Sequence, residues 1–288
     1  MILYPNAKLN LGLQIVRKRE DGFHELRTLF VPYFGLKDIL EVLPAKELKM
    51  YRYGLAYDGK AMDNICIKAY RALEEDFAIP PVEIHLYKKI PVGAGLGGGS
   101  ADGSFTLIAL NEIYKLGLSK EQLCKYAAKI GSDCPFFIYN QPMMASGRGE
   151  ILTQYDFPME DYKFEVINPK IHITTAEAYS KIIPRERLKS MVAGGEDISS
   201  LTDCPIDKLD TSLEEILSLE PSSWRELLIN DFEPSTFERH PKLAEIKSDL
   251  YSKGAIYASL SGSGSAMFGM NKKKKVEISL EETLNYDA

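Results

Sequence analysis

The sequence predicts an α+β protein, and three observations support this fold class. Segments in which apolar and polar residues alternate, as in half-buried strands, occur at 7–15 and 82–87, and two further strand-like segments lie near the end of the chain, at 254–260 and 266–270. Longer apolar runs with helix start and stop signals lie between them, the clearest over 63–77 and 105–116. The regular βαβ alternation of a doubly wound parallel sheet is missing around the glycine-rich segment 91–103.

Composition and charge limit the classes of function. At 288 residues the chain can bury a substantial core, as one large domain or two. The formal net charge of −6 gives no general attraction to nucleic acid or to an anionic membrane, so we expect neither as a partner. The four cysteines lack C-x-x-C spacing, which suits a reducing compartment. The sequence has no signal-peptide pattern and no apolar stretch of membrane-spanning length, so we expect a soluble, cytoplasmic protein.

The first predicted strand covers residues 7–15. Its odd positions are almost all apolar, and the polar positions share the opposite face: Lys8, Asn10, Gly12 and Gln14. One face is therefore expected in a core, while the other presents an ammonium and an amide group. The charged turn 17–22 ends in Asp-Gly, which predicts a hairpin and a second strand over 23–31.

Two helices and one short connection follow. A helix is predicted over 63–77 with Asp63 as its N-cap, and two prolines then break the chain before a strand at 82–87. Ser119 begins a capping-box pattern that opens a helix ending at Gly131. Asp133 lies in a tight connection between that helix and an apolar segment expected to be a strand. An Asp in such a place often forms a turn by bonding to nearby backbone.

The segment between the strand at 82–87 and the helix at 105–116 contains five glycines from Gly93 to Gly99. Glycines let backbone approach a ligand, and the free N–H groups of a first helical turn point at an anion bound there. The G-x-G-x-x-G match alone is weak, because dinucleotide-binding proteins share it, and the lysine of a Walker loop is missing. A flexible linker would have polar flanks, whereas both flanks are apolar. The segment is therefore predicted to bind phosphate.

The second half of the chain has fewer chemical signals. Two strands at 254–260 and 266–270 are joined by Ser-Gly-Ser-Gly-Ser at 261–265, which is either a plain hairpin turn or a second backbone surface over a nucleotide. The run Lys272–Lys275 is predicted to be a solvated turn. Further elements are predicted at 145–150 (turn), 163–167 (strand), 174–179 (helix), 185–222 (short helices and turns) and 243–250 (helix).

Together these segments resemble the GHMP small-molecule kinases, named for galactokinase, homoserine, mevalonate and phosphomevalonate kinases. The three motifs of that family match residues 5–11, 91–103 and 261–265. Further blocks at 21–30 and 131–137 are most similar to the branch that phosphorylates a cytidine diphosphate-linked alcohol in the non-mevalonate isoprenoid pathway. The departures from that branch are Phe23 in place of Tyr, Ala101 in place of Ser, and Ser132 in place of Ala. None of them removes a group that the chemistry requires.

The resemblance implies a two-lobed fold with the active site in the cleft between the lobes. The ATP-binding lobe would cover mainly residues 1–150 and the substrate lobe 151–288, with early strands around 10–33 contributing to the substrate lobe.

The resemblance also implies roles for single residues, with ATP and Mg²⁺ as cofactors. Asp133 would be the general base and Lys8, beside it, would supply the cation that the missing Walker lysine does not. The Ser100 hydroxyl would contact Mg²⁺ or a phosphate oxygen. ATP would be contacted by Asn64 at the adenosine end and along the phosphates by Pro91, Gly93, Ala94, Gly95, Leu96, Gly97, Gly98, Gly99, Ser100 and Ala101. The cytidine substrate would be contacted by Asn10, Phe23, His24, Thr175 and Tyr179, with Phe23 and Tyr179 flanking the base.

Three alternative functions stay open at this point. A GHMP kinase for homoserine or mevalonate is one, although those relatives lack the Phe23-His24 pair. A non-catalytic nucleotide sensor on the same fold is another, although Lys8 and Asp133 argue for catalysis. A dinucleotide oxidoreductase is the third, and comparing the binding of ATP with that of NAD would exclude it.

Overall fold

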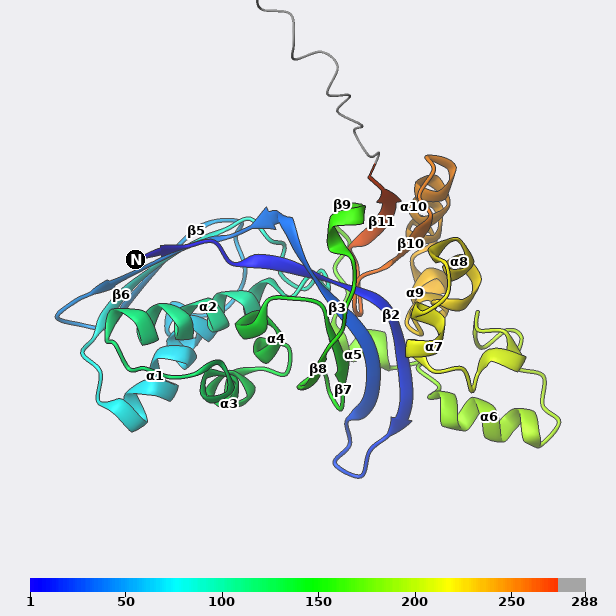
Figure 1. The fold of residues 1–288 in the computed structure, drawn as a ribbon, viewed down its shortest axis with the longest axis horizontal. Coiled ribbons are helices and arrows are strands. Elements are labelled where there is room, and N and C mark those ends of the chain that lie inside the picture. Colours follow the sequence, from blue (N-terminus) through cyan, green and yellow to red (C-terminus); the bar gives the residue numbers. More distant parts are fainter. Residues whose placement is uncertain (274–288) are drawn as a thin grey trace, which may run out of the picture.

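The structure is a computed structural model, and it describes residues 1–273. It is an elongated α+β molecule with three sheets and helices packed around them (Figure 1). The first sheet has the strand order β1-β4-β6-β5, with β5 parallel to β6 and the other pairs antiparallel. Its strands are β1 (Ile2–Leu3), β4 (Ile39–Pro44), β5 (Lys49–Gly54) and β6 (Val82–Lys88).

The second and third sheets are antiparallel. The second has the order β2-β3-β7-β8, made of β2 (Asn6–Lys18), β3 (His24–Lys37), β7 (Met143–Ser146) and β8 (Ile151–Gln154). The third has the order β10-β11-β9, made of β9 (Tyr162–Ile167), β10 (Tyr257–Leu260) and β11 (Met267–Lys272). The predicted first strand, its hairpin turn and the pair of strands around 261–265 are confirmed. Figure 1 shows the long strands β2 and β3 running through the middle of the molecule, between its two halves.

The helices divide between those halves. The first four pack on the first sheet, in a core cluster that includes Leu73, Ile84 and Leu107: α1 (Ile65–Phe77), α2 (Gly98–Ile113), α3 (Lys120–Ile130) and α4 (Cys134–Tyr139). The others lie in the half that contains β10 and β11 (Figure 1): α5 (Thr175–Tyr179), α6 (Arg185–Ala193), α7 (Leu213–Leu217), α8 (Trp224–Leu227), α9 (Glu233–Arg239) and α10 (Pro241–Ser252). Short 3₁₀ turns occur at Ala61–Asp63, Met159–Asp161, Ile206–Lys208 and Pro221–Ser223.

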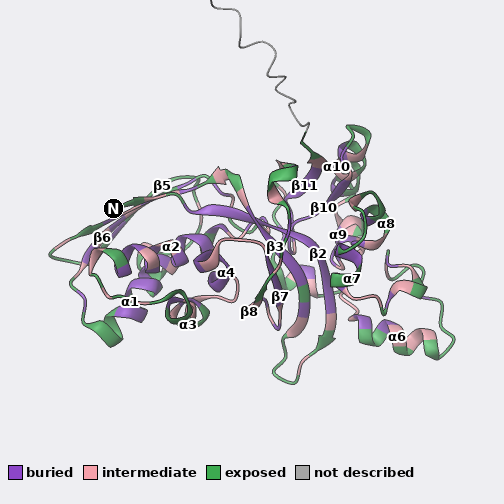
Figure 2. Ribbon diagram, in the orientation of Figure 1, coloured by how far each residue is buried: buried purple, intermediate pink, exposed green. Residues whose placement is uncertain are grey.

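Strand β2 is buried on both faces at its start. Residues from Asn6 to Ile15 are all buried, and Figure 2 shows this part of β2 as a continuous buried ribbon. Lys8 is only 4% exposed, so its ammonium is not the solvated group of an ordinary surface strand. A buried ammonium has to be compensated by partners, because desolvating a charge costs several kcal/mol.

A bulge at Gly12 changes which face of β2 each residue takes. The β2–β3 register shifts between Leu11 and Leu13, and Gly12 adopts a φ of +64°. One extra residue reverses the alternation of side chains, so Leu13 lines the same cavity as Lys8 and Asn10. Gln14 lines a different cavity. The prediction that Gln14 shares a face with Lys8 and Asn10 is therefore wrong.

Three local predictions also differ from the structure. Asn64, not Asp63, caps α1, and its side chain accepts a hydrogen bond from the Cys66 N–H. Helix α2 begins at Gly98, inside the glycine segment, and ends at Ile113, before Gly117. Residues 134–139 form a short helix, not a strand, because Pro135 stands in its first turn, where the missing N–H costs nothing.

The end of the chain is described only in part. Lys272 is the last residue of β11, so the predicted solvated turn is wrong there, and Lys274 and Lys275 lie outside the described residues. The Ser119 capping box is confirmed with both of its hydrogen bonds. In residues 1–273 no helix has the length and apolar character needed to cross a membrane. All four cysteines are free thiols.

Candidate active site

The three motif segments meet at the glycine loop. The Lys8 N–H of β2 donates to the Leu96 carbonyl over 2.9 Å. From the 261–265 loop, the Ser261 hydroxyl donates to the Gly95 carbonyl over 3.0 Å, and the Ala266 N–H donates to the Ala94 carbonyl over 3.0 Å. The 261–265 segment is therefore both a hairpin turn between β10 and β11 and a second backbone surface against the glycine loop.

Two glycines allow this close approach. Gly95 has a φ of +75°, and a Cβ there would overlap the Ser261 carbonyl oxygen. Gly97 has a φ of +70°, and its Cβ would lie 2.8 Å from Lys8 Cγ and 2.9 Å from the Phe137 ring. Both positions thus need glycine for backbone conformation and for space.

A cavity of about 390 Å³ runs along the glycine loop. It is lined by residues 91–100 together with Ile65, Ile173, Thr175 and Ser263. Gly98, Gly99 and Ser100 form the first turn of α2, whose N–H groups have no partner earlier in the helix. Ala101 does not line this cavity: its side chain is fully buried and its N–H donates to the Gly97 carbonyl. The cavity has the form of an anion site at a helix N-terminus.

Lys8 and Asp133 face each other in a second cavity, of about 250 Å³. Lys8 Nζ lies 3.6 Å from Asp133 Oδ2 and donates to Asn10 Oδ1 over 2.5 Å. Asn10 in turn donates to the Thr28 hydroxyl over 3.0 Å. This chain of bonds fixes the ammonium beside the carboxylate.

Lys8 and Asp133 differ in how far each is buried. Burial lowers the pKa of the Lys8 ammonium, and the nearby Asp133 carboxylate works in the opposite direction. The Asp133 side chain is 31% exposed and stands at the start of α4, where it makes no capping hydrogen bond. The interpretation of Asp133 as a mere turn-former is therefore not supported, and its carboxylate is open to the cavity.

The two cavities adjoin each other. Gly95, Gly97, Thr175 and Ser263 line both of them. On its other side the loop cavity shares Ile65, Val92 and Gly99 with a third cavity, of about 210 Å³. Asn64 lines this third cavity, and its Nδ2 donates to the Tyr57 hydroxyl over 2.8 Å. The three cavities thus follow one another along the glycine loop.

The aromatic residues of the predicted base site are arranged differently from the expectation. The His24 ring stacks on Tyr179, with centroids 4.9 Å apart, and the Tyr179 ring meets Phe232 edge to face. Phe23 is exposed, and Arg148 lies over its ring at 4.8 Å. Because His24 covers a face of Tyr179, a base held between Phe23 and Tyr179 would require His24 to move. Burial lowers the pKa of His24, which favours its neutral ring.

Sequence reasoning missed two residues that shape the site. Arg148 lines the Lys8 cavity from a turn in which Gly147 and Gly149 both have positive φ. The sequence signal that could have identified Arg148 is its position between two glycines, Gly147 and Gly149. Asn230 is fully buried, and its amide donates to the carbonyls of Leu260 and Gly262, each over 2.8 Å. It thus anchors the 261–265 loop, and no local pattern marks it.

The site offers few side-chain ligands for a metal ion. Residues 1–273 contain no group of three His, Cys, Asp or Glu side chains that could hold one. The side-chain oxygen groups at the loop are the hydroxyls of Ser100, Thr175 and Ser263, and the adjoining cavity adds the carboxylate of Asp133. Such a sparse set fits a Mg²⁺ ion that takes most of its ligands from nucleotide phosphates and water.

Two family models match the chain: the GHMP kinases N terminal domain over residues 64–141 and the GHMP kinases C terminal domain over 207–285. The chain is 42% identical to 4-diphosphocytidyl-2-C-methyl-D-erythritol kinase of Bacteroides thetaiotaomicron, covering 94% of this chain and 92% of that protein. It is also 42% identical to the protein of the same name from Azobacteroides pseudotrichonymphae, covering 95% and 94%.

Solved structures show the same similarity. A crystal structure of 4-(cytidine 5'-diphospho)-2C-methyl-D-erythritol kinase superposes with a TM-score of 0.68 at 30% identity, covering 93% of this chain and 89% of that one. The mevalonate kinase of Methanococcus jannaschii superposes with a TM-score of 0.64 at 16% identity, covering 94% and 90%, which indicates a shared fold alone.

Proposed function

Because the chain belongs to the GHMP kinase family, we propose that it transfers the γ-phosphoryl group of ATP to a hydroxyl of 4-diphosphocytidyl-2-C-methyl-D-erythritol. The acceptor in this proposal is the 2-hydroxyl, and the reaction serves the formation of isoprenoid precursors by the non-mevalonate route. One observation carries the proposal: the Lys8–Asp133 pair lies where the loop cavity adjoins a second cavity. The relatives at 42% identity over nearly the whole chain support the choice of substrate.

ATP would lie along the Asn64 cavity and the loop cavity, and its γ-phosphate would meet the substrate where the loop cavity adjoins the Lys8 cavity. Its adenosine end would be near Asn64, and its phosphates would run over residues 91–100 toward Gly97. The unpaired N–H groups of Gly98, Gly99 and Ser100 would donate to phosphate oxygens, and the dipole of α2 would favour the negative charge.

The chemistry of transfer would take place at Asp133. Its carboxylate would accept the proton of the acceptor hydroxyl as the oxygen attacks the γ-phosphorus. Lys8 would stabilise negative charge on the attacking oxygen and on the transferred group. The bond from Lys8 to Asn10 would hold the ammonium in position for both tasks.

A Mg²⁺ ion would offset the charge of the phosphates when bound. Ser100 is the residue that we assign to it, because the Ser100 hydroxyl lines the loop cavity in the first turn of α2.

The cytidine end of the substrate would bind beside His24 and Tyr179. Tyr179 lines the Lys8 cavity and stacks on His24. The two rings therefore extend from the cavity that contains Asp133 toward the surface where Phe23 lies. Thr175 lines both the loop cavity and the Lys8 cavity, a position suited to contacts with the transferred phosphoryl group. Arg148, which lines the same cavity, would meet the diphosphate of the substrate.

The lobes of this proposal are residues 1–150 on the ATP side and 151–288 on the substrate side, with strands from 10–33 joined to the second. Residues 274–288 of the second lobe lie outside the described part of the chain.

An ADP-release assay over a panel of acceptors tests the proposal. With ATP and Mg²⁺ we expect rapid ADP release with the diphosphocytidyl alcohol and only background release with mevalonate, homoserine or no acceptor. The position of the new phosphate can be checked by ³¹P NMR of the product. Faster turnover with mevalonate or homoserine would replace the substrate assignment, and ATP binding without turnover on any acceptor would favour a nucleotide sensor.

A further inference from the structure

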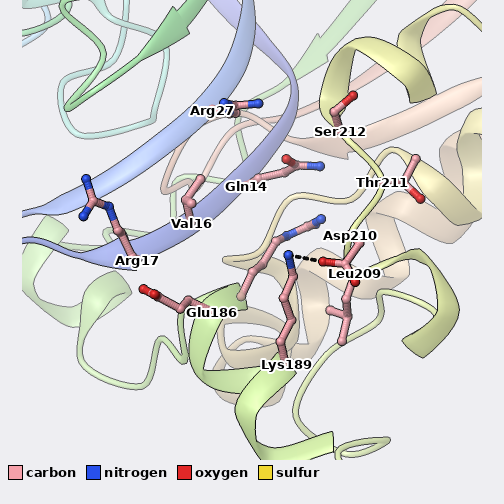
Figure 3. A pocket seen from close by; sticks show the side chains of 11 residues that line it. Gln14, Val16, Arg17, Arg27, Glu186, Lys189, Leu209, Asp210, Thr211 and Ser212 are labelled. Atoms are coloured by element: carbon pink, nitrogen blue, oxygen red, sulfur yellow. Dashed lines mark ion pairs between the residues drawn. The ribbon is translucent and has the colours of Figure 1, made fainter. Parts of the chain in front are cut away.

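A fourth cavity, of about 310 Å³, lies apart from the three already described and shares no lining residue with them. Its walls come from the β2–β3 hairpin, from the start of α6 and from the segment before α7. Figure 3 shows Arg17 and Arg27 on the strands and Lys189 on the helix. In this view Gln14 lies between Arg27 and Lys189. The bulge at Gly12 is what brings Gln14 to this cavity.

One buried side chain in this wall, Arg185, has a donor group without a partner in residues 1–273. Arg185 is 4% exposed, and its Nε and Nη2 bond to the two carboxylate oxygens of Asp231 over 2.9 and 2.8 Å. Its Nη1 is buried and has no hydrogen-bond partner in residues 1–273. Gln14 lines the same cavity, and its amide adds a polar group to the wall. Leaving the buried Arg185 donor without an acceptor costs about 1–3 kcal/mol, so a ligand that accepts from it gains affinity.

The rim adds cations whose present partners are weak. Arg27 Nη1 is 3.8 Å from Glu214 Oε2, which is longer than a hydrogen bond. Arg17 Nε donates a hydrogen bond to Glu25 Oε2, and the two terminal nitrogens of Arg17 take no part in that bond. Lys189 pairs with Asp210 at the surface, as the dashed line in Figure 3 marks. Exposed pairs of this kind contribute about 0–1 kcal/mol, so an anion with several charges can replace them.

The cations of the lining are only partly engaged by carboxylates. Four cationic side chains line the cavity together with the carboxylates of Glu186 and Asp210. Asp231, Glu25 and Glu214 pair from outside the lining with Arg185, Arg17 and Arg27, so an anion binds here by replacing the weak exposed pairs of the rim. Donors approach from the hairpin on one side and from α6 on the other, so they do not share one plane. A tetrahedral phosphate accepts from several directions, whereas a planar carboxylate accepts best within one plane.

We propose that this cavity binds a small phosphate-bearing anion, a phosphate ester or a diphosphate. Arg27 and Lys189 hold the phosphate, Arg17 adds positive charge at the rim, and the Gln14 amide and the Arg185 guanidinium line the inner end. The volume exceeds that of a single phosphate group, so the remainder of the ligand is small and polar. This site is independent of the function proposed above, because none of its residues lines the reaction site.

Titration of ¹⁵N-labelled protein with inorganic pyrophosphate, followed by NMR, tests this proposal. The glycine loop also attracts phosphate, so the two sites are followed separately, through the Gln14 side-chain amide and through the backbone amides of Gly97 and Gly99. We expect a saturable shift of the Gln14 signals. Arg27→Gln should weaken binding at this site by about 10- to 100-fold, which corresponds to one charge-assisted hydrogen bond, and leave the loop titration unchanged.

Lys181→Gln is the matched control, because it also removes one exposed cation, which pairs with Glu238 at the surface and lies outside the cavity. Lys189→Gln provides a second test on α6 if Arg27→Gln changes the melting temperature. Malonate, a dicarboxylate, should bind more weakly than pyrophosphate. The proposal is overturned if the Gln14 signals do not saturate, if Arg27→Gln and Lys181→Gln bind equally well, or if malonate matches pyrophosphate.

Discussion

Lys8 Nζ lies 3.6 Å from Asp133 Oδ2, and both groups line the cavity that adjoins the glycine loop. One comes from the first long strand and the other from the connection between α3 and α4. The ammonium is nearly buried, whereas the carboxylate is partly open. A cation held next to an accessible base is the arrangement that proton removal from an alcohol requires.

Asp133→Asn is expected to abolish most of the turnover while leaving ATP binding largely intact. The amide keeps the shape of the side chain but cannot accept the proton, so kcat should fall by about 10²–10⁴. Steady-state kinetics together with an ATP-binding titration measure both effects. Asp249→Asn is a suitable control, because Asp249 forms an exposed pair with Lys253 on α10. Near-full turnover in Asp133→Asn would return Asp133 to a structural role.

Lys8 is expected to limit activity on the alkaline side. Burial lowers the pKa of its ammonium from the ordinary value of 10.5, and Asp133 opposes this shift. The charged form is needed and is lost as the pH rises through the pKa, so kcat/KM should decline at a lower pH than for an ordinary lysine. Lys8→Arg should lose this decline, since a guanidinium stays protonated, although its absolute rate will be lower. A wild-type profile that is flat up to pH 10.5 would contradict this assignment.

Gly99→Val is expected to damage ATP binding far more than folding. A Cβ at Gly99 meets no atom within 4 Å, and the residue lines both the loop cavity and the Asn64 cavity. The valine side chain would therefore occupy ligand space, and we expect a loss of ATP affinity of about tenfold or more with a small change in melting temperature. Gly97→Val is the comparison, because its side chain would overlap Lys8 and Phe137 and should cost stability as well. Equal losses of stability in the two variants would mean that the Gly99 position is structural.

His24→Ala is expected to weaken binding of the cytidine substrate and to leave ATP binding nearly unchanged. The ring contacts Tyr179, and burial lowers its pKa, so the neutral imidazole is available to bond the edge of a base. A base that cannot pair with the His24 ring leaves that group without a hydrogen bond, which costs about 1–3 kcal/mol of binding free energy. Removing the ring removes this penalty, so His24→Ala should discriminate less against a uridine analogue.

The measurement for this variant is kcat/KM for the cytidine and uridine forms of the substrate. His85→Ala is the control, since His85 stacks between Tyr51 and Tyr53 on the first sheet, in none of the described cavities. If the cytidine-to-uridine ratio is the same in wild type and His24→Ala, His24 serves packing with Tyr179 and does not select the base.

The sequence by itself determined the features that depend on neighbouring residues. The capping box at Ser119 and the Asp-Gly hairpin after β2 follow from local backbone chemistry, and both positions were predicted. The glycine loop was recognisable from its composition, and its phosphate-binding role stays a prediction. Lys8 and Asp133 could be named in advance only through the resemblance to the GHMP kinases, because a lone Asp in a tight connection before a proline is often a turn-former.

The tertiary structure alone decided which residues meet. The bulge at Gly12 sends Gln14 to another cavity. A glycine within a strand can mark a bulge, but the close contact of Gly12 with Leu213 and Leu228, from a distant part of the chain, is visible only in the tertiary structure. The stacking of His24 on Tyr179 and the bonds from Asn230 to the 261–265 loop join segments far apart in the chain. Periodicity describes one element at a time, whereas such contacts depend on how several elements pack together.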